Sequence, residues 1–294
     1  MEKKTILSRE VFLTIDYVIL VLSALICLLP MINVLALSFS SSTAAAANEV
    51  KLWPVDFTLA SYKYAITKPE FIQSLVVSAK RVIVGVPINM VLTICVAYPL
   101  SKDNRKFHFR QVYVWFFVIT MIFNGGLIPT YMVVKSYHLI DSIWALVLPI
   151  ALPVFNVILL LNFFKGLPKE IEEAAFIDGA GHITSLVAIY LPLSAPSLAT
   201  ISLFALVTHW NSWFDGLIFM NKTVNYPLQT YLQSLVVSHD LKLMNTKEME
   251  RLALINDRTL KASQIFLAAV PVLIVYPFLQ KYFTKGIVLG SVKG

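Results

Sequence analysis

The chain has 294 residues, of which 57% are hydrophobic and only 14% are charged, and its formal net charge is +7. Soluble domains average about 25% charged residues. These figures exclude an ordinary water-soluble domain and indicate that much of the chain is buried in lipid.

Six segments contain no Asp, Glu, Lys or Arg and are long enough to cross a membrane. A spanning helix needs about 20 predominantly apolar residues, whereas a membrane strand takes about 10 residues of alternating character. The sequence therefore predicts an all-α membrane protein with six transmembrane helices. The expected spans are 13–38, 72–100, 111–134, 142–164, 184–213 and 262–282.

The first apolar run follows Lys3 and Lys4, an arrangement that secretory signals also have. Its apolar core is about twice as long as that of a signal, so we expect an uncleaved span. Cys27 and Cys95 both fall inside predicted spans. We expect them to behave as small hydrophobic residues, not as a disulfide or a metal pair.

Lys and Arg are distributed unevenly between the two sides of the predicted membrane. The two chain ends and the connections 101–110 and 165–185 hold twelve of them in 55 residues, and the opposite connections hold ten in 86. Connections rich in Lys and Arg tend to stay in the cytoplasm. Both termini, and the connection between the fourth and fifth spans, are therefore expected to be cytoplasmic.

That connection contains a short acidic segment, residues 168–182. Pro168 suits the first position of a helix and Gly179 suits the residue just past its end, which predicts a short cytoplasmic helix. A helix lying on lipid usually carries Lys and Arg, so the acids favour a protein partner, with lipid as the alternative. The expected apolar stripe, which another protein could approach closely, is Ile171, Ala174, Ala175 and Ile177. The acids expected elsewhere on the surface of the helix are Glu170, Glu172, Glu173 and Asp178.

Seven residues of this region resemble the EAA motif of bacterial ABC importer permeases: Glu173, Ala174, Ala175, Gly179, Ile189, Leu191 and Pro192. Three further segments, "FNGGLIPTYMVVKS" (123–136), "NSWFDGLIF" (211–219) and the tail 277–294, are similar to carbohydrate-importer permeases of the MalG and LplC type. The resemblance covers about residues 70–294, which we expect to be the core of a single permease domain, 1–294.

The resemblance implies a non-catalytic subunit that crosses the bacterial cytoplasmic (inner) membrane several times and works by alternating access. Its implied partners are the lipid bilayer, a second homologous permease, a dimeric ATPase that binds the ATP, and an extracytoplasmic solute-binding protein that delivers a sugar. No nucleic acid and no cofactor of its own are implied. The implied ATPase-coupling residues are Glu172, Glu173, Ala174, Ala175, Asp178 and Gly179.

The sequence itself carries no sign of a catalytic centre. It has no Gly-Lys dipeptide, and therefore no P-loop, and no Cys/His spacing typical of a metal site. Two alternatives stay open. An ion-coupled secondary transporter would keep acids inside its spans, and none is expected here. A membrane-embedded enzyme would need a convergent acid, base and nucleophile, which the sequence does not offer.

Lys80 and Arg81 interrupt the second predicted span. Charges in mid-membrane cost about 2.5–3.5 kcal/mol on insertion scales, so one interpretation places both at the outer interface. In the other, one of them faces the cavity, because adjacent helical residues point about 100° apart. No acid in a neighbouring span is expected to neutralise it, and the cargo would then be an acidic oligosaccharide.

Four further residues are candidates for the substrate pathway. Asn124 opens a helix-breaking "NGGLIP" segment, which must lie near the outer interface or line the cavity. His209 is interpreted as a packed or cavity polar residue. Aromatic and amide groups suit sugars, although Trp at an interface is a common membrane pattern, and we favour that pattern for Trp213. The remaining candidates are Trp210 and Asn211.

The longest connection, 215–261, has 47 residues. Long loops in compact proteins are often functional, and the corresponding loop of MalG-like permeases reaches toward the binding protein. We therefore expect Tyr226, Gln229 and Gln233 to contact the solute-binding protein, with a solvated loop as the alternative. A short helix is expected within 246–261.

Overall fold

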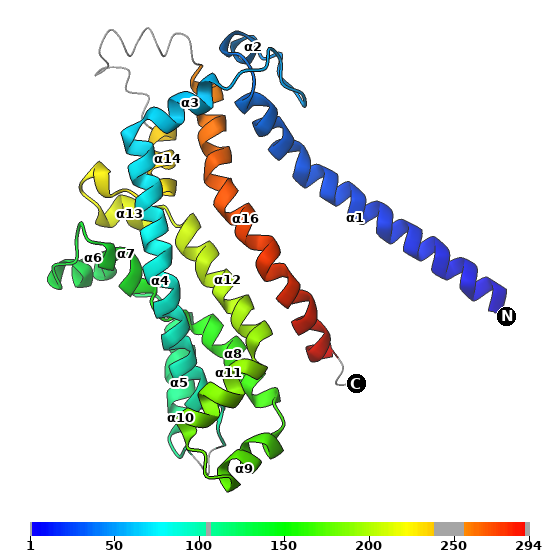
Figure 1. Cartoon of the computed structure of the whole chain (residues 1–294), viewed down its shortest axis with the longest axis vertical. Coiled ribbons are helices and arrows are strands. Elements are labelled where there is room, and N and C mark those ends of the chain that lie inside the picture. Colours follow the sequence, from blue (N-terminus) through cyan, green and yellow to red (C-terminus); the bar gives the residue numbers. More distant parts are fainter. Residues whose placement is uncertain (1, 104–106, 238–255, 292–294) are drawn as a thin grey trace. The chain divides into compact units, whose positions relative to one another are not determined.

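The computed structural model describes residues 2–103, 107–237 and 256–291, and every regular element in these ranges is a helix (Figure 1). The chain divides into two compact units. The first comprises residues up to Pro69 and the stretch ending at Ala269, and the second comprises Glu70–Val237 and the rest of the C-terminal helix. The second unit begins where the family-like core of the sequence begins.

In its described residues, the first unit holds three complete helices and the start of a fourth. Ser41 caps α2 by accepting the N–H of Ala44 at 3.2 Å. The Ser61 hydroxyl donates to Thr259 at 2.9 Å, which ties α3 to the start of α16. The elements are α1 (Glu2–Ser38), α2 (Ser42–Ala46), α3 (Ala60–Thr67) and α16 (Asp257–Ser291).

The second unit is built around the long helix α4, Pro69–Ser101. The other elements are α5 (Arg110–Ile122), α6 (Leu127–Ser136), α7 (Ile143–Val147), η1 (Leu148–Ile150), α8 (Val154–Gly166), α9 (Lys169–Ile177), α10 (His182–Ser185), η2 (Leu186–Tyr190), α11 (Leu191–Leu193), α12 (Ala195–Asn211), α13 (Phe214–Phe219), η3 (Thr223–Asn225) and α14 (Leu228–Val237).

One face of α4 is buried along its whole length, and that face is unusually polar. Its members recur every three or four residues, the period that places side chains on one side of a helix. Small and polar residues let membrane helices approach closely and bond to one another. The buried residues on this face include Ser74, Ser78, Arg81, Gly85, Asn89, Thr93 and Ala97.

An apolar core surrounds the second half of α4. Ala97 and Leu100 pack with Leu160 and Phe164 of α8, and Ile201 of α12 closes the cluster. A second cluster of buried apolar residues joins α6, α7 and α13. Its buried members are Val134, Ala145, Leu146, Phe219 and Met220.

Three helical segments are long and apolar enough to cross a membrane unbroken: Arg9–Ser38, Pro69–Ser101 and Asp257–Pro277. Three further candidates are pairs of helices bent at a short break, which gives up to six spans in the described ranges. The prediction of a helical, multi-span chain is confirmed, and each of the spans predicted over 111–134, 142–164 and 184–213 is a bent pair of helices. The interruption at 124–129 was expected from the sequence, whereas the bend within 184–213 was not.

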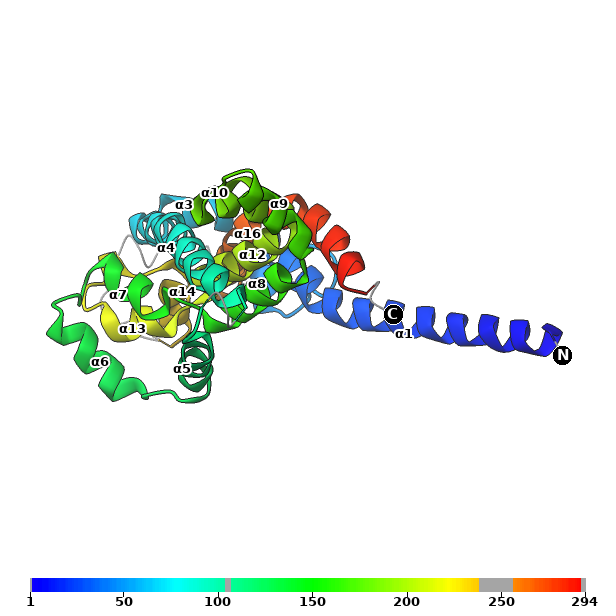
Figure 2. The same cartoon turned by 90° about the horizontal axis from the view of Figure 1, so that it is seen from below.

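Each break follows from residues that interrupt a helix. The α5–α6 pair bends by 113° (Figure 2), and Gly126 there has φ +85°, a conformation that side-chain-bearing residues rarely adopt. The α7–α8 bend of 47° falls before Pro153, the N-cap of α8, and Pro149 lies in the turn before it. The 82° bend between α11 and α12 lies at Ser194, between Pro192 and Pro196.

Candidate functional site

The short acidic helix predicted from the sequence is α9, which lies at one end of the second unit (Figure 1). Its outward face carries Glu173 and Ala174 together with two apolar side chains, Ile171 and Ile177. Ile177 is 86% exposed. An apolar side chain that exposed, on a helix between acidic residues, suits contact with another protein better than contact with water.

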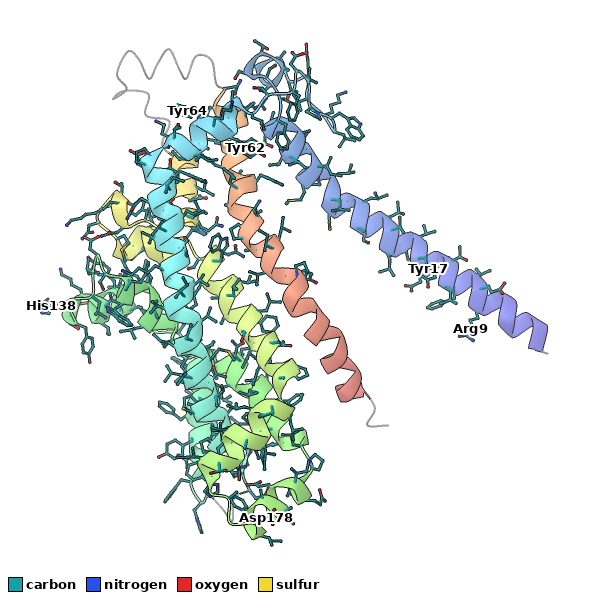
Figure 3. All side chains as sticks on the ribbon, in the orientation of Figure 1. Arg9, Tyr17, Tyr62, Tyr64, His138 and Asp178 are labelled. Carbon is teal, nitrogen blue, oxygen red and sulfur yellow. The ribbon has the colours of Figure 1, made fainter. Side chains whose placement is uncertain are left out.

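The end of α9 has the hydrogen bonds of a Schellman motif. The Gly179 N–H donates to the Phe176 carbonyl at 3.1 Å, and the Ala180 N–H donates to the Ala175 carbonyl at 2.9 Å. Gly179 has φ +83°, as the motif requires of the residue after the helix. The expected turn at Gly179 is confirmed, and Figure 3 shows the neighbouring Asp178 at the outer tip of this corner.

Two of the expected coupling residues face inward instead. Glu172 is only 7% exposed and Ala175 only 9%. They are three residues apart and so share a face of the helix, which packs against the rest of the second unit. The expectation that Glu172 lies on the surface and that Ala175 belongs to the outward stripe is therefore wrong.

Glu172 sits in a cluster of three other side chains. One carboxylate oxygen pairs with the Lys102 ammonium at 2.9 Å, and the other accepts the Tyr190 hydroxyl at 2.9 Å. The Lys102 ammonium also lies 4.0 Å from the ring centres of both Tyr98 and Tyr190. Buried charges are tolerated when they are paired in this way, and aromatic faces attract the cation further.

An exposed ion pair lies beside this cluster. Lys169, at the start of α9, contacts Asp103, the residue after Lys102, at 2.8 Å. The hydrogen bond that Lys169 donates to Asp103, together with the negative charge of Asp103, raises the pKa of Lys169 above the ordinary lysine value. The side chains are 68% and 62% exposed, so the pair is screened by solvent and contributes little to stability by itself.

The second notable arrangement is at the other end of the unit, where Arg81 is completely buried. Its Nε donates to His209 Nδ1 at 3.4 Å and its Nη2 to the Leu146 carbonyl at 3.1 Å. Its Nη1 donates to the Ser212 carbonyl at 3.5 Å and to Asp215 Oδ1 at 3.2 Å. Nη2 also contacts Asp215 Oδ2, so all five guanidinium N–H groups have an acceptor.

The chain of hydrogen bonds continues through His209. Because His209 Nδ1 accepts from Arg81, its Nε2 carries the proton and donates to Asn89 Oδ1 at 2.9 Å. The Asn89 amide donates in turn to the carbonyls of Ile150 and Ala151, at 2.9 and 2.7 Å. These carbonyls lie at the α7–α8 break, so Asn89 replaces hydrogen bonds that the broken helix cannot supply.

The pair with Asp215 corrects one expectation. No acid in a neighbouring span was expected to neutralise a cation at position 80 or 81, but Asp215, just after the fifth predicted span, neutralises Arg81. Asp215 also accepts from the Ser212 hydroxyl at 2.8 Å and from the Gly216 N–H at 2.9 Å. Its place just after the fifth apolar run put it at the same membrane side as Arg81, which is the sequence signal that was available.

The other pathway candidates divide between surface and interior. Lys80 is exposed on α4, on a different face from Arg81, as the 100° rotation requires. Asn124 and Asn211 are exposed, whereas Trp210 is only 6% exposed. His209 is packed against Gly85, where a Cβ atom would come within 2.4 Å of the imidazole. Contact of any of these residues with cargo stays a prediction.

The segment after α13 is also held by a carboxylate acceptor, Asp141, which is partly exposed. The Asp141 carboxylate accepts the N–H groups of Asn221 and Lys222, at 2.7 and 3.1 Å. Partial removal from water raises the pKa of Asp141, but the two N–H groups, the Asn225 side chain and the charge of Lys222 together outweigh this effect and bring the pKa below its ordinary value.

Of the residues expected to contact a binding protein, Gln229 and Gln233 lie on α14 and are partly exposed. Tyr226 packs partly against the cluster of α6, α7 and α13. The short helix expected within 246–261 falls mostly outside the described residues. Within the described part of the chain, no group of three His, Cys, Asp or Glu side chains could hold a metal ion.

Residues 111–289 match the family model of the binding-protein-dependent transport system inner membrane component. The chain belongs to this family. It is therefore a multi-pass permease of the inner membrane, and the relatives below are permeases of the same kind.

The permease is 40% identical to the polygalacturonan/rhamnogalacturonan transport system permease YtcP of Bacillus subtilis, covering 98% of this chain and 100% of YtcP. It is 41% identical to LplC of the same organism, over 92% and 90% of the two chains. Among solved structures, it resembles a bacterial ABC transporter involved in the import of the acidic polysaccharide alginate. That match has a TM-score of 0.86 and 32% identity, covering 94% of this chain and 98% of the other.

The buried pair generates a prediction about the stability of the permease. Asp215→Asn leaves the Arg81 guanidinium buried without a counter-charge, which should cost about 3–5 kcal/mol. We expect a lower melting temperature in detergent and less protein in the membrane. Lys80→Gln, at the exposed neighbour, is the matched control and should change stability by less than about 0.5 kcal/mol. If Asp215→Asn has the same melting temperature as Lys80→Gln, the Arg81–Asp215 pair does not stabilise the fold.

Proposed function

We propose that this permease is one of two membrane subunits in an ATP-driven importer of acidic oligosaccharides. In this proposal its N and C termini are cytoplasmic, and its outward α9 face seats on a partner ATPase. The ATPase binds and hydrolyses ATP, and the permease itself performs no chemistry. A solute-binding protein delivers the cargo on the opposite side of the membrane.

The observation that carries the coupling part of this proposal is the outward face of α9. It combines an exposed carboxylate, Glu173, with a small residue, Ala174, and two exposed apolar side chains, Ile171 and Ile177. The helix ends in a tight turn at Gly179 that leaves this face unobstructed. A small residue beside a charge allows a partner to approach closely and fixes the orientation in which it docks.

The arrangement of the second unit supports the same sidedness. α9 lies at one end of α4, and α13 and α14 lie toward the other end (Figure 1). A membrane between them would leave α9 facing the ATPase and the segment with Gln229 and Gln233 facing the binding protein. Closure of the ATPase would then displace α9, and the permease would open toward the binding protein.

The acidic character of the cargo is supported by two relatives of different origin. One is named for polygalacturonan and rhamnogalacturonan transport, and another takes part in the import of alginate. Galacturonan and alginate are both polymers of uronic acids. Arg81 cannot attract such a cargo in this state, because it is buried and neutralised by Asp215. Of the two adjacent cations, the exposed Lys80 is the one able to meet a carboxylate.

Docking on the ATPase is tested by reversing the charge of the outward glutamate. Glu173→Arg should reduce the amount of ATPase that co-purifies with the permease by about tenfold, because a like charge replaces a complementary one at the contact. Glu70→Arg makes the same reversal at an exposed acid at the other end of α4, and it should have no effect. Equal recovery of the ATPase with both variants would contradict the docking proposal.

The turn after α9 is tested by comparing two glycines. A Cβ at either Gly179 or Gly181 meets no atom within 4 Å, but only Gly179 has a positive φ. Gly179→Val should therefore strain the turn by about 1–2 kcal/mol and lower uptake, whereas Gly181→Val should not. Gly179→Asn should be tolerated, because Asn accepts this conformation. Uptake by Gly179→Val at the level of Gly181→Val would show that the turn geometry is not needed.

Cargo class is tested by uptake in cells that carry the complete importer. We expect uronic-acid oligosaccharides to be taken up in preference to neutral oligosaccharides of the same length. Lys80→Gln should reduce uptake of the acidic series and leave the neutral series unchanged. A preference for neutral cargo in the unmodified importer would refute the acidic assignment, and an equal loss of both series in the variant would assign Lys80 another role.

A further inference from the structure

We propose that Glu172 is a positioning residue that makes α9 move as one body with the end of α4. The inference rests on the proposed docking of α9 on an ATPase, and it adds the contacts through which a displacement of α9 is transmitted to the membrane helices. We call the contacts concerned the α9 clasp. It consists of the buried cluster Glu172, Lys102, Tyr98 and Tyr190 and the exposed pair Lys169–Asp103.

The buried half of the clasp joins three separate parts of the second unit. Glu172 belongs to α9, and Lys102 directly follows α4. Tyr190 ends η2, which leads into α11 and then α12. Because one carboxylate binds both Lys102 and Tyr190, a displacement of α9 must either carry both partners or break a buried charged contact. Breaking such a contact is costly because it leaves a charge without water or counter-ion.

In the exposed pair of the clasp, the acid and the cation come from the opposite segments to those of the buried pair. In the buried pair α9 supplies the acid and α4 leads into the cation, whereas in the exposed pair α9 supplies Lys169 and the α4 end supplies Asp103. Residues 169 and 172 are one turn apart on α9, and 102 and 103 are adjacent. Two neighbouring pairs of opposite polarity match in only one alignment of the two segments, so they fix the register of α9 as well as its contact.

The two tyrosines of the clasp also belong to the apolar core of the unit. Tyr98 and Tyr190 stack edge to face at 5.1 Å, and each packs against Phe164 of α8. Both tyrosines belong to the cluster that contains Leu160 and Ile201. Displacement of α9 is therefore passed to α4, α8 and α12 through packed side chains, and not only along the chain through the turn at Gly179.

The first test separates docking from transmission in the assembled importer. Glu172→Gln keeps an acceptor for the Tyr190 hydroxyl but removes the charge opposite Lys102. We expect the co-purified ATPase to be retained and the ATP hydrolysed per oligosaccharide imported to rise about tenfold, within the usual range of coupling between sites. Glu173→Gln, the adjacent and outward glutamate, should instead reduce the ATPase recovered.

The second test compares a disruptive and a conservative substitution of Lys102, the partner of Glu172. Lys102→Met should raise the ATP cost of import as Glu172→Gln does, whereas Lys102→Arg keeps the charge and the stacking on the tyrosine rings and should restore it. A purely structural role would lower uptake and hydrolysis together, in proportion to the amount of complex. An unchanged ratio in both Glu172→Gln and Lys102→Met would overturn the proposal.

A cross-link tests the movement directly and does not depend on weakening the fold. Asp103 and Lys169 are exposed neighbours, so cysteines at both positions, in a chain with Cys27 and Cys95 replaced by alanine, can be joined by a short bis-methanethiosulfonate reagent, which forms a disulfide with each thiol and releases methanesulfinate. If α9 and the end of α4 move as one body, the cross-linked importer transports as well as the same variant before cross-linking. Loss of transport on cross-linking, reversed by reduction, would show that the two segments move apart and would refute the clasp.

The outcomes distinguish this inference from the proposal beneath it. If Glu173→Arg leaves the ATPase bound, then α9 is not the docking helix and the proposed function fails. If Glu173→Arg releases the ATPase while Glu172→Gln releases it to the same extent, α9 docks but Glu172 acts at the interface, and only the clasp fails.

Discussion

Polar groups that leave water must find partners inside the protein, and the second unit shows how far this constraint reaches. Arg81 could not remain charged and buried without the five acceptors that surround it. Those acceptors come from α7, from His209 in α12 and from the residues around α13. The same network continues to Asn89, whose amide donates to the backbone carbonyls left without helical partners at the α7–α8 break. One buried cation thus determines how four helices meet, and permits a broken span among them.

The lower half of α4 solves the same problem with different partners. Lys102 and Glu172 neutralise each other, and two tyrosine rings cover the cation. The long helix α4 therefore carries a buried positive charge near one end and another just beyond its other end, and each is held by an acid from a distant part of the chain. The apolar clusters fill the space between helices, whereas these ion pairs specify which helices lie together.

Much of this could be predicted from the sequence, and the failures have physical causes. The charge-free runs located the spans, because a charge in lipid is costly wherever it occurs. The Pro168 and Gly179 positions predicted α9 and its turn. The break near Gly126 was indicated by the glycines of the "NGGLIP" segment, whereas the break at Ser194 was missed because a run of apolar residues does not reveal where its helix bends. Glu172 was placed outside because periodicity identifies the two faces of a short helix but not which one is buried. The Asp215 partner of Arg81 was missed because pairing depends on how distant segments meet.

Glu172 and Glu173 are chemically identical neighbours that point about 100° apart on α9. Glu172 is buried and bonded to Tyr190, whereas Glu173 is open to solvent. A rotation of α9 by one residue would exchange the environments of the two glutamates. It would leave the composition and charge of the helix the same and would shift its small residues by one position. Only the enclosure on the inner side distinguishes the two arrangements. In this family of permeases, therefore, the role of a glutamate in the motif should not be assigned from its position in a sequence alignment alone. The residues that face the inner side of the helix, at the positions of Lys102 and Tyr190, tell which glutamate points inward.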